Sequence, residues 1–129
     1  MNIKIINQEK DISRVIINDP KTYNSLSTKN LNDLIKVFKR LDNDKNIKVI
    51  ILEGAGKGFS AGHNLKEVRS LKVRKKYQKL FNLCSKLMLQ IVEGRKPVIA
   101  KVHGAAFAAG CQLVASCDLA YSTKDALFA

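Results

Sequence analysis

Apolar and polar residues follow one another along the chain in segments that predict strands and helices in turn. Two short segments rich in isoleucine, 3–6 and 12–17, predict strands, and the polar residues between them predict a hairpin turn. The segments 47–52 and 98–102 are almost continuously apolar, a pattern typical of strands buried on both faces of a parallel sheet. One more strand is predicted at 118–121.

Helical spacing of apolar residues marks three other segments. Ser27 is a suitable cap for a helix over 28–41, whose apolar positions share one face. A second helix is predicted over 73–92, and a short third one over 109–116. The apolar stripe of the second helix, which we expect to face the core, consists of Tyr77, Leu80, Phe81, Cys84, Leu87, Met88 and Ile91. The alternation of strands and helices predicts an α/β fold without internal repeats or linkers.

The length and composition fit one globular domain, since the chain has 129 residues of which 46% are hydrophobic. No apolar run reaches the roughly 18 residues of a membrane span, and the first residues lack the order of a signal peptide. We therefore expect no membrane partner, and a location in a bacterial-type cytoplasm or in the mitochondrial matrix. The final residues 126–129 predict the start of an unpaired strand, which favours a truncated polypeptide.

A strong basic excess, 23 Lys and Arg against 11 Asp and Glu, gives a net charge of +12. Such a surface attracts polyanions, either a phosphorylated cofactor or nucleic acid, unless it is a basic surface with no specific partner. The densest cluster, 72–79, falls on the second predicted helix, so its charges spread around the solvent face. Only Tyr77 interrupts it, which argues against base stacking and makes nucleic acid the less favoured partner.

The cysteines do not indicate a metal centre or a disulfide framework. Cys84, Cys111 and Cys117 are odd in number, and their spacing matches no zinc motif. We expect all three to be buried free thiols in a reducing compartment, and we predict no metal site.

Two segments rich in small residues, 56–66 and 103–112, carry the most specific functional information. Each follows a predicted strand and leads into a helical segment. Small residues let a ligand approach the backbone closely, and the free N–H groups at a helix start hold negative charge. The pattern alone leaves two interpretations open: two ordinary strand-to-helix turns, or two turns that converge on one oxygen and form an oxyanion hole.

The residues of these segments resemble a known family. Residues 54–67, Gly-Ala-Gly-Lys-Gly-Phe-Ser-Ala-Gly-His-Asn-Leu-Lys-Glu, are similar to the first signature of the crotonase, or enoyl-CoA hydratase/isomerase, superfamily. Residues 103–113 and 116–120 are similar to the second signature, and residues 24–26, Asn-Ser-Leu, resemble an early Asn-Ala-Leu motif. These motifs stand in the family's order and spacing over essentially the whole chain.

The resemblance implies the crotonase-like spiral fold of ββα units, with residues 1–129 as a partial domain that forms its N-terminal portion. It implies a lyase or isomerase of fatty acid metabolism that takes coenzyme A thioesters as substrates and holds no permanent cofactor. Self-association into trimers, or into hexamers made of paired trimers, is the usual assembly that the resemblance implies for the full-length protein.

Carried over by position, the resemblance assigns the two oxyanion donors to the backbone N–H groups of His63 and Ala109. Ser25 and Leu26 would line the coenzyme A channel. The other positions that it assigns to coenzyme A binding, mainly through backbone atoms, are Ala61, His63, Asn64, Leu65, Lys66 and Gly110.

Two departures from the family pattern bear on catalysis. Family hydratases use two glutamates to place and activate water, and Gln112 stands at the position of the first. Because an amide has no basic site near neutral pH, Gln112 can orient a water or the substrate, or bond locally at the helix start, but it cannot act as a base. The second glutamate would fall beyond residue 129 in the family alignment. The His63 imidazole is a further candidate for an acyl contact or an acid–base role, whereas His103 and Asp118 are expected to be structural.

Three functions follow from these observations. The favoured one is an acyl-CoA-binding protein that stabilises a thioester enolate in a backbone oxyanion hole, with weak or altered hydratase or isomerase activity. The first alternative is a non-catalytic acyl-CoA binder or regulatory protein, which Gln112 favours. The second is a nucleic-acid-binding protein, which the net charge and the cluster 72–79 favour.

Overall fold

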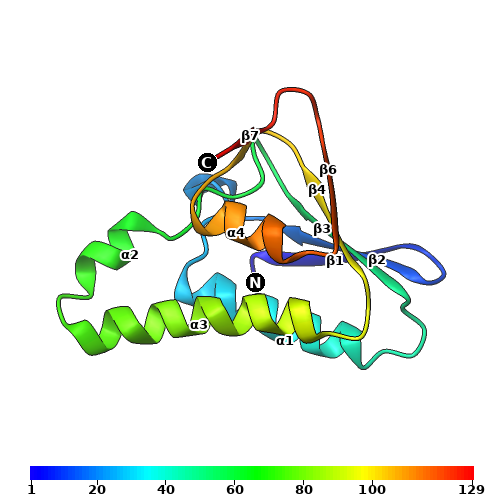
Figure 1. Ribbon diagram of the computed structural model, residues 1–129, viewed down its shortest axis with the longest axis horizontal. Coiled ribbons are helices and arrows are strands. Elements are labelled where there is room, and N and C mark those ends of the chain that lie inside the picture. The colour runs from blue at the N-terminus through cyan, green and yellow to red at the C-terminus, as the bar shows by residue number, and fades with distance from the viewer.

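The computed structural model describes residues 1–129 and confirms a mixed α/β fold built on one five-stranded sheet (Figure 1). The strands, in their order across the sheet, are β1 (Ile3–Glu9), β2 (Ile12–Ile17), β3 (Val49–Gly54), β4 (Val98–Val102) and β6 (Leu119–Ser122). β1 pairs antiparallel with β2 in the predicted hairpin, and every other pair in this sheet is parallel. The strands predicted at 12–17 and 98–102 have the predicted bounds.

The helices are α1 (Thr28–Asp42), α2 (Leu65–Ser70), α3 (Arg74–Glu93) and α4 (Ala109–Ser116), and a single 3-10 turn, η1, spans Pro20–Thr22. Of these, α1, α3 and α4 lie within a residue of the predicted segments. α1 and α3 run side by side along the same side of the sheet (Figure 1). None of the helices has the length and apolar character that a membrane span requires.

Two local differences from the sequence prediction have simple causes. The sequence does not predict α2, because six residues are too few to show helical periodicity. The helix is instead fixed by its cap, since the Asn64 side chain accepts hydrogen bonds from the N–H groups of Lys66 and Glu67 at 3.0 and 3.3 Å. β3 starts at Val49, two residues later than expected, because a hydrogen-bonded turn over 44–47 occupies the first predicted positions.

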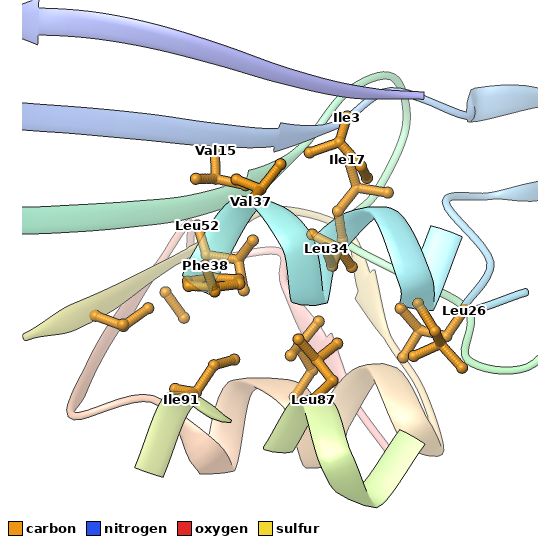
Figure 2. Close-up of a cluster of buried hydrophobic side chains, with 14 of the residues drawn as sticks. Ile3, Val15, Ile17, Leu26, Leu34, Val37, Phe38, Leu52, Leu87 and Ile91 are labelled. Carbon is orange, nitrogen blue, oxygen red and sulfur yellow. The ribbon is translucent and has the colours of Figure 1, made fainter. Parts of the chain in front are cut away.

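The core lies between the sheet and α3, with α1 in the middle (Figure 2). Ser27 caps α1 as predicted, because its Oγ accepts a hydrogen bond from the N–H of Asn30 at 3.1 Å. Figure 2 shows Val37 of α1 beside the strands, and Leu87 and Ile91 of α3 pointing toward α1. Burial of these side chains fixes the position of α3, which in turn carries part of the site described below.

The apolar stripe of α3 serves two surfaces rather than one. Its core-facing members are Leu80, Cys84, Leu87 and Ile91, which are buried as expected. Phe81 is 46% exposed, and Phe81 and Met88 line a cavity between α3 and α4. The expectation that the whole stripe faces the core is therefore wrong for Phe81, whereas Met88 is partly buried against the core and also lines the cavity.

The last strand of the chain, β7 (Leu127–Phe128), pairs in parallel with β5 (Ala105–Ala106). The N–H of Leu127 donates to the carbonyl oxygen of Gly104 at 2.9 Å, and that of Ala129 donates to Ala106 at 3.3 Å. The expectation of an unpaired strand at 126–129 is therefore wrong. The sequence does not show this pairing, because β5 has only two residues and lies inside the second small-residue segment.

A bidentate ion pair joins β2 and β3 on the sheet face opposite α1. Arg14 donates from Nη2 and Nε to the two carboxylate oxygens of Glu53 at 2.6 and 3.0 Å. The Glu53 side chain is only 12% exposed, so the pair is poorly screened by water. Hydrogen bonding to Arg14 and its charge hold the pKa of Glu53 below its ordinary value, against the opposing effect of burial.

Replacing Glu53 by glutamine is expected to lower the free energy of unfolding by about 2 kcal/mol at neutral pH, because Arg14 loses a charged acceptor. The folded-state pKa of Glu53 lies below its unfolded value of about 4.3, so the stabilisation is complete above that pH. It is lost as the pH falls through the folded-state pKa, and the two proteins should converge in acid. Urea unfolding over a pH series checks this. Asp33→Asn, which removes the more exposed pair with Lys29, is the control and should cost under about 1 kcal/mol. A Glu53→Gln penalty that stays constant into acid would contradict the account.

Candidate active site

The two small-residue segments lie side by side and hydrogen-bond to each other. The N–H groups of Phe59 and Ser60 both donate to the carbonyl oxygen of Ala105, at 3.0 and 3.1 Å. The N–H of Phe107 returns a bond to the carbonyl oxygen of Ser60 at 3.0 Å, so Ser60 and Ala106 form a parallel bridge. The segments are therefore two halves of one backbone structure at the ends of β3 and β4.

Two side chains reinforce this structure. Nε2 of His103 donates to the carbonyl oxygen of Gly56 at 2.7 Å, which links the segments once more and confirms a structural role for this histidine. Asn24 is 1% exposed, and its Nδ2 donates to the carbonyl oxygens of Ala55 and Gly58 at 2.8 and 2.9 Å. The Asn-Ser-Leu motif thus holds the first segment in place through its asparagine.

The two segments also approach each other closely at Gly62 and Ala109. A β-carbon on Gly62 would lie 2.9 Å from the carbonyl oxygen of Phe107 and 3.2 Å from the backbone nitrogen of Ala109. Gly62 also has φ of +91°, a conformation that favours glycine. Glycine at this position therefore allows the peptide of His63, the next residue, to stand beside the start of α4.

The backbone N–H groups of His63 and Ala109 make no hydrogen bonds among those of the turns and loops. Ala109 is the first residue of α4, so its N–H carries part of the positive end of the helix dipole. The neighbouring N–H of Gly110 is occupied, because it donates to the carbonyl oxygen of Phe107 at 2.8 Å. Two N–H groups from adjacent turns are thus free to bind an acceptor.

Both residues lie on the wall of one cavity of about 700 Å³. The lining residues are His63, Phe81, Cys84, Ser85, Met88, Ala108, Ala109, Cys111, Gln112, Ala115 and Ala129. Eight of the 11 are hydrophobic, and none is Asp or Glu, so the wall suits an apolar group that carries one polar acceptor.

Gln112, which the family resemblance assigns to a glutamate position, lies on this wall with its side chain exposed. Its backbone carbonyl accepts a bond from Ser116 Oγ at 2.9 Å, whereas its amide forms no bond within the chain. The alternative of local side-chain bonding at the helix start is therefore not supported. Gln112 is free to contact a ligand, but it offers an amide where a base would be needed.

The remaining candidate residues surround the paired segments without lining the cavity. Gly110 packs against the Ser60 carbonyl group. Ser25 is buried, with its Oγ bonded to Thr22 Oγ1 at 2.9 Å, and Leu26 is fully enclosed in the core while its N–H donates to Gly62. Their places along a coenzyme A channel stay predictions.

The candidates that follow in the first segment form its edge and the start of α2. Ala61 is exposed, and its N–H donates to the carbonyl oxygen of Tyr23 at 3.0 Å. Asn64 caps α2, and Leu65 and Lys66 stand exposed on its first turn. These residues form a rim next to His63 that carries one basic side chain, Lys66, and one exposed apolar side chain, Leu65; their contacts with coenzyme A stay predictions.

All three cysteines are free thiols, as expected, but only Cys84 is buried, and Cys111 and Cys117 are half-buried. Burial raises the pKa of Cys84. Burial, helped by the charge of Asp118, raises the pKa of Cys117 to about 12, and its Sγ donates to the carbonyl oxygen of Leu113 at 3.3 Å. Asp118 itself is structural, since its Oδ2 accepts a bond from the N–H of Val98 at 2.8 Å.

The sequence misses the contribution of α3 to the cavity. Phe81, Ser85 and Met88 line it from the side opposite α4. The only available signal is the unusual width of the apolar stripe, because the packing of α3 against α4 depends on tertiary contacts.

Replacing Ala108 by glycine is expected to stabilise the protein by about 1 kcal/mol. Ala108 has φ +50° and ψ −119°, a strained conformation that costs about 1–3 kcal/mol for a residue with a β-carbon. Glycine gives the unfolded chain more conformational freedom, which lowers the free energy of unfolding by roughly 0.4–1 kcal/mol. The methyl group of Ala108 is exposed and contributes little packing. Denaturant unfolding measures the change. A less stable variant would contradict the assigned backbone conformation.

A sheet with four parallel strands, two paired turns and a cavity against α4 define an α/β protein with a mainly apolar candidate site. The model of the enoyl-CoA hydratase/isomerase family matches residues 7–129, and the chain belongs to this family.

Individual relatives agree with this assignment. The chain is 42% identical over 127 residues to enoyl-CoA hydratase domain-containing protein 3, mitochondrial, of Xenopus laevis, covering 98% of this chain and 43% of that protein. It is 33% identical over 129 residues to the short-chain-enoyl-CoA hydratase of Clostridium acetobutylicum, covering 99% of this chain and 49% of that protein.

Solved structures show the same fold. The crystal structure of an enoyl-CoA hydratase from Mycobacterium smegmatis matches with a TM-score of 0.97 and 43% identity, covering 100% of this chain and 50% of that one. Human enoyl-CoA hydratase domain-containing protein 3 matches with a TM-score of 0.94 and 38% identity, covering 100% and 51%. The predicted crotonase-like fold is confirmed, and the chain spans about half the length of the relatives it matches.

Proposed function

We propose that this protein binds acyl-CoA thioesters in the cavity and polarises the thioester carbonyl between the backbone N–H groups of His63 and Ala109. The observation that carries the proposal is the presence of two unpaired N–H groups, adjacent across Gly62, on the wall of one mainly apolar cavity. A carbonyl oxygen gains negative charge as an enolate forms, so both hydrogen bonds strengthen at that point. Membership of the enoyl-CoA hydratase/isomerase family supports the choice of thioester.

The cavity favours enolate chemistry over the addition of water. Its apolar residues on α3 and α4 suit an acyl chain, and the dipole of α4 favours negative charge near Ala109. Water addition needs a base that activates the water, and Gln112 cannot fill that role. The acyl-CoA is a substrate in this proposal, and no permanently bound cofactor is required.

The nucleotide end of coenzyme A is assigned to the rim formed by Asn64, Leu65 and Lys66. The rim borders His63, and the net charge of +12 favours the phosphate groups. Self-association into trimers or hexamers is part of the proposal through membership of the enoyl-CoA hydratase/isomerase family. Mitochondrial and bacterial relatives leave both predicted locations, the matrix and the cytoplasm, open.

Calorimetry with the full chain tests the proposal by comparing butyryl-CoA with S-butyl-CoA, a thioether that lacks only the carbonyl oxygen. Two neutral hydrogen bonds of about 1 kcal/mol each predict tighter binding of the thioester by at least about tenfold. Equal affinities would show that the carbonyl oxygen is not bound, and no binding of either compound would exclude the cavity as an acyl-CoA site.

A non-catalytic acyl-CoA binder or regulatory protein is the second candidate, and the amide of Gln112 favours it. The two candidates differ in turnover of a bound unsaturated acyl-CoA. Loss of the enoyl absorbance of crotonyl-CoA measures hydration, and gain of it from but-3-enoyl-CoA measures isomerisation. Binding without either reaction would establish the second candidate.

A further inference from the structure

The ionisable side chains on the cavity wall are few. They are His63, Cys84 and Cys111. An enolate forms only when a base removes the proton from the carbon next to the thioester carbonyl. Burial raises the pKa of Cys84, so this thiol stays protonated and cannot accept that proton. The His63 imidazole lies on the cavity wall and belongs to the same residue as one of the two N–H donors.

The orientation of the His63 ring leaves one nitrogen for a ligand. Nδ1 is fully enclosed and has no hydrogen-bond partner. The ring contacts Phe81 edge to face, with centroids 5.2 Å apart and an interplanar angle of 67°, which restrains it against rotation. Nε2 is not enclosed in this way, and His63 lies on the cavity wall. The backbone N–H of His63 is thus available for the carbonyl oxygen while its Nε2 is available for a neighbouring atom of the same ligand.

We propose that the His63 imidazole transfers the proton at the α-carbon of the bound acyl-CoA, in addition to the role of its backbone N–H; this rests on the proposed function. Nε2 takes the α-proton, and the electron pair of the broken C–H bond moves into the enolate. The enolate oxygen accepts hydrogen bonds from the N–H groups of His63 and Ala109. The imidazolium then returns the proton, to the α-carbon in exchange or to the γ-carbon of a 3-enoyl thioester in isomerisation.

The test uses the full chain and but-3-enoyl-CoA in D₂O. Nuclear magnetic resonance follows deuterium at the α-carbon, absorbance follows formation of the conjugated isomer, and calorimetry measures binding. His63→Phe keeps the backbone N–H and an aromatic contact with Phe81 but removes both ring nitrogens. It should bind within about threefold of the unmodified protein and lose proton transfer by at least about 100-fold. His63→Ala should lose it likewise and recover part of it with added imidazole.

Asp33→Asn is the control, because Asp33 lies on α1 outside the cavity and pairs with the exposed Lys29; it should transfer protons at the unmodified rate. Proton transfer in His63→Phe at the unmodified rate would overturn the inference, and so would an unmodified protein that binds but-3-enoyl-CoA without exchange or isomerisation. Absence of binding to the unmodified protein would instead reject the proposed function, and this inference with it.

Discussion

Replacing Gly62 by alanine is expected to reduce proton transfer on a bound acyl-CoA by about 100-fold or more. The new β-carbon would lie 3.2 Å from the Ala109 nitrogen, where the carbonyl oxygen has to accept a hydrogen bond. Alanine would also be strained at the φ of +91° that Gly62 adopts. Relief of this strain would move the His63 peptide away from Ala109. Loss of one oxyanion donor costs roughly 3–4 kcal/mol in the transition state. Isomerisation of but-3-enoyl-CoA and the affinity ratio of butyryl-CoA to S-butyl-CoA measure the effect, and that ratio should fall to about one.

Gly56→Ala separates this effect from general destabilisation. Gly56 has a similar φ of +80°, and its β-carbon would meet the Pro20 side chain at 2.9 Å, but it does not line the cavity. Both variants should lose comparable stability, and only Gly62→Ala should lose its preference for the thioester. An unchanged thioester preference in folded Gly62→Ala would contradict the assigned pair of donors.

Replacing Gly110 by alanine is expected to lower the free energy of unfolding by about 3 kcal/mol or more, or to prevent folding. A β-carbon here would collide with the carbonyl oxygen of Ser60 and come within 2.9 Å of its carbon. Hydrogen bonds between the two segments hold the backbone of Ser60 and the backbone before Gly110 in place. Neither backbone can move without breaking the bridge between Ser60 and Ala106. Denaturant unfolding measures the loss, and circular dichroism shows whether the variant folds.

Helix propensity predicts the opposite sign for the same substitution. Gly110 lies inside α4 without a positive φ, so alanine should stabilise the isolated helix by about 1 kcal/mol. A stabilised Gly110→Ala protein would therefore show that the two segments do not pack as closely as described.

The sequence predicts the elements that form through local patterns. β2, β4 and α4 have the predicted bounds because their apolar runs and flanking small residues are distinct. α2 is missed although Asn64 and Glu67 stand in the spacing of a capping motif, which is the signal that could have found it. The pairing of β5 with β7 has no local signal, since two-residue strands are defined by their partners.

The candidate site likewise has a part that the sequence predicts and a part that it does not. The two turns, with His63, Ala109 and Gln112, follow from small residues between strand and helix and from the family resemblance, and all three residues line the cavity. The contribution of Phe81 and Met88 depends on how α3 packs between α1 and α4, which hydrophobic spacing does not specify. The sequence also cannot show that the N–H groups of His63 and Ala109 are unpaired, because this depends on all the backbone hydrogen bonds of the folded chain.

In the proposed complex two backbone N–H groups hold one thioester oxygen, so the carbonyl stretching frequency of bound butyryl-CoA reports on both donors. Isotope-edited infrared difference spectroscopy with a ¹³C-labelled carbonyl isolates this vibration in the complex with the full chain. Hydrogen bonds from His63 and Ala109 weaken the carbonyl double bond, so the account predicts a frequency below that of butyryl-CoA in water, and recovery of the solution value in Gly62→Ala. A saturated complex of the unmodified protein whose carbonyl frequency equals the value in water would contradict the account.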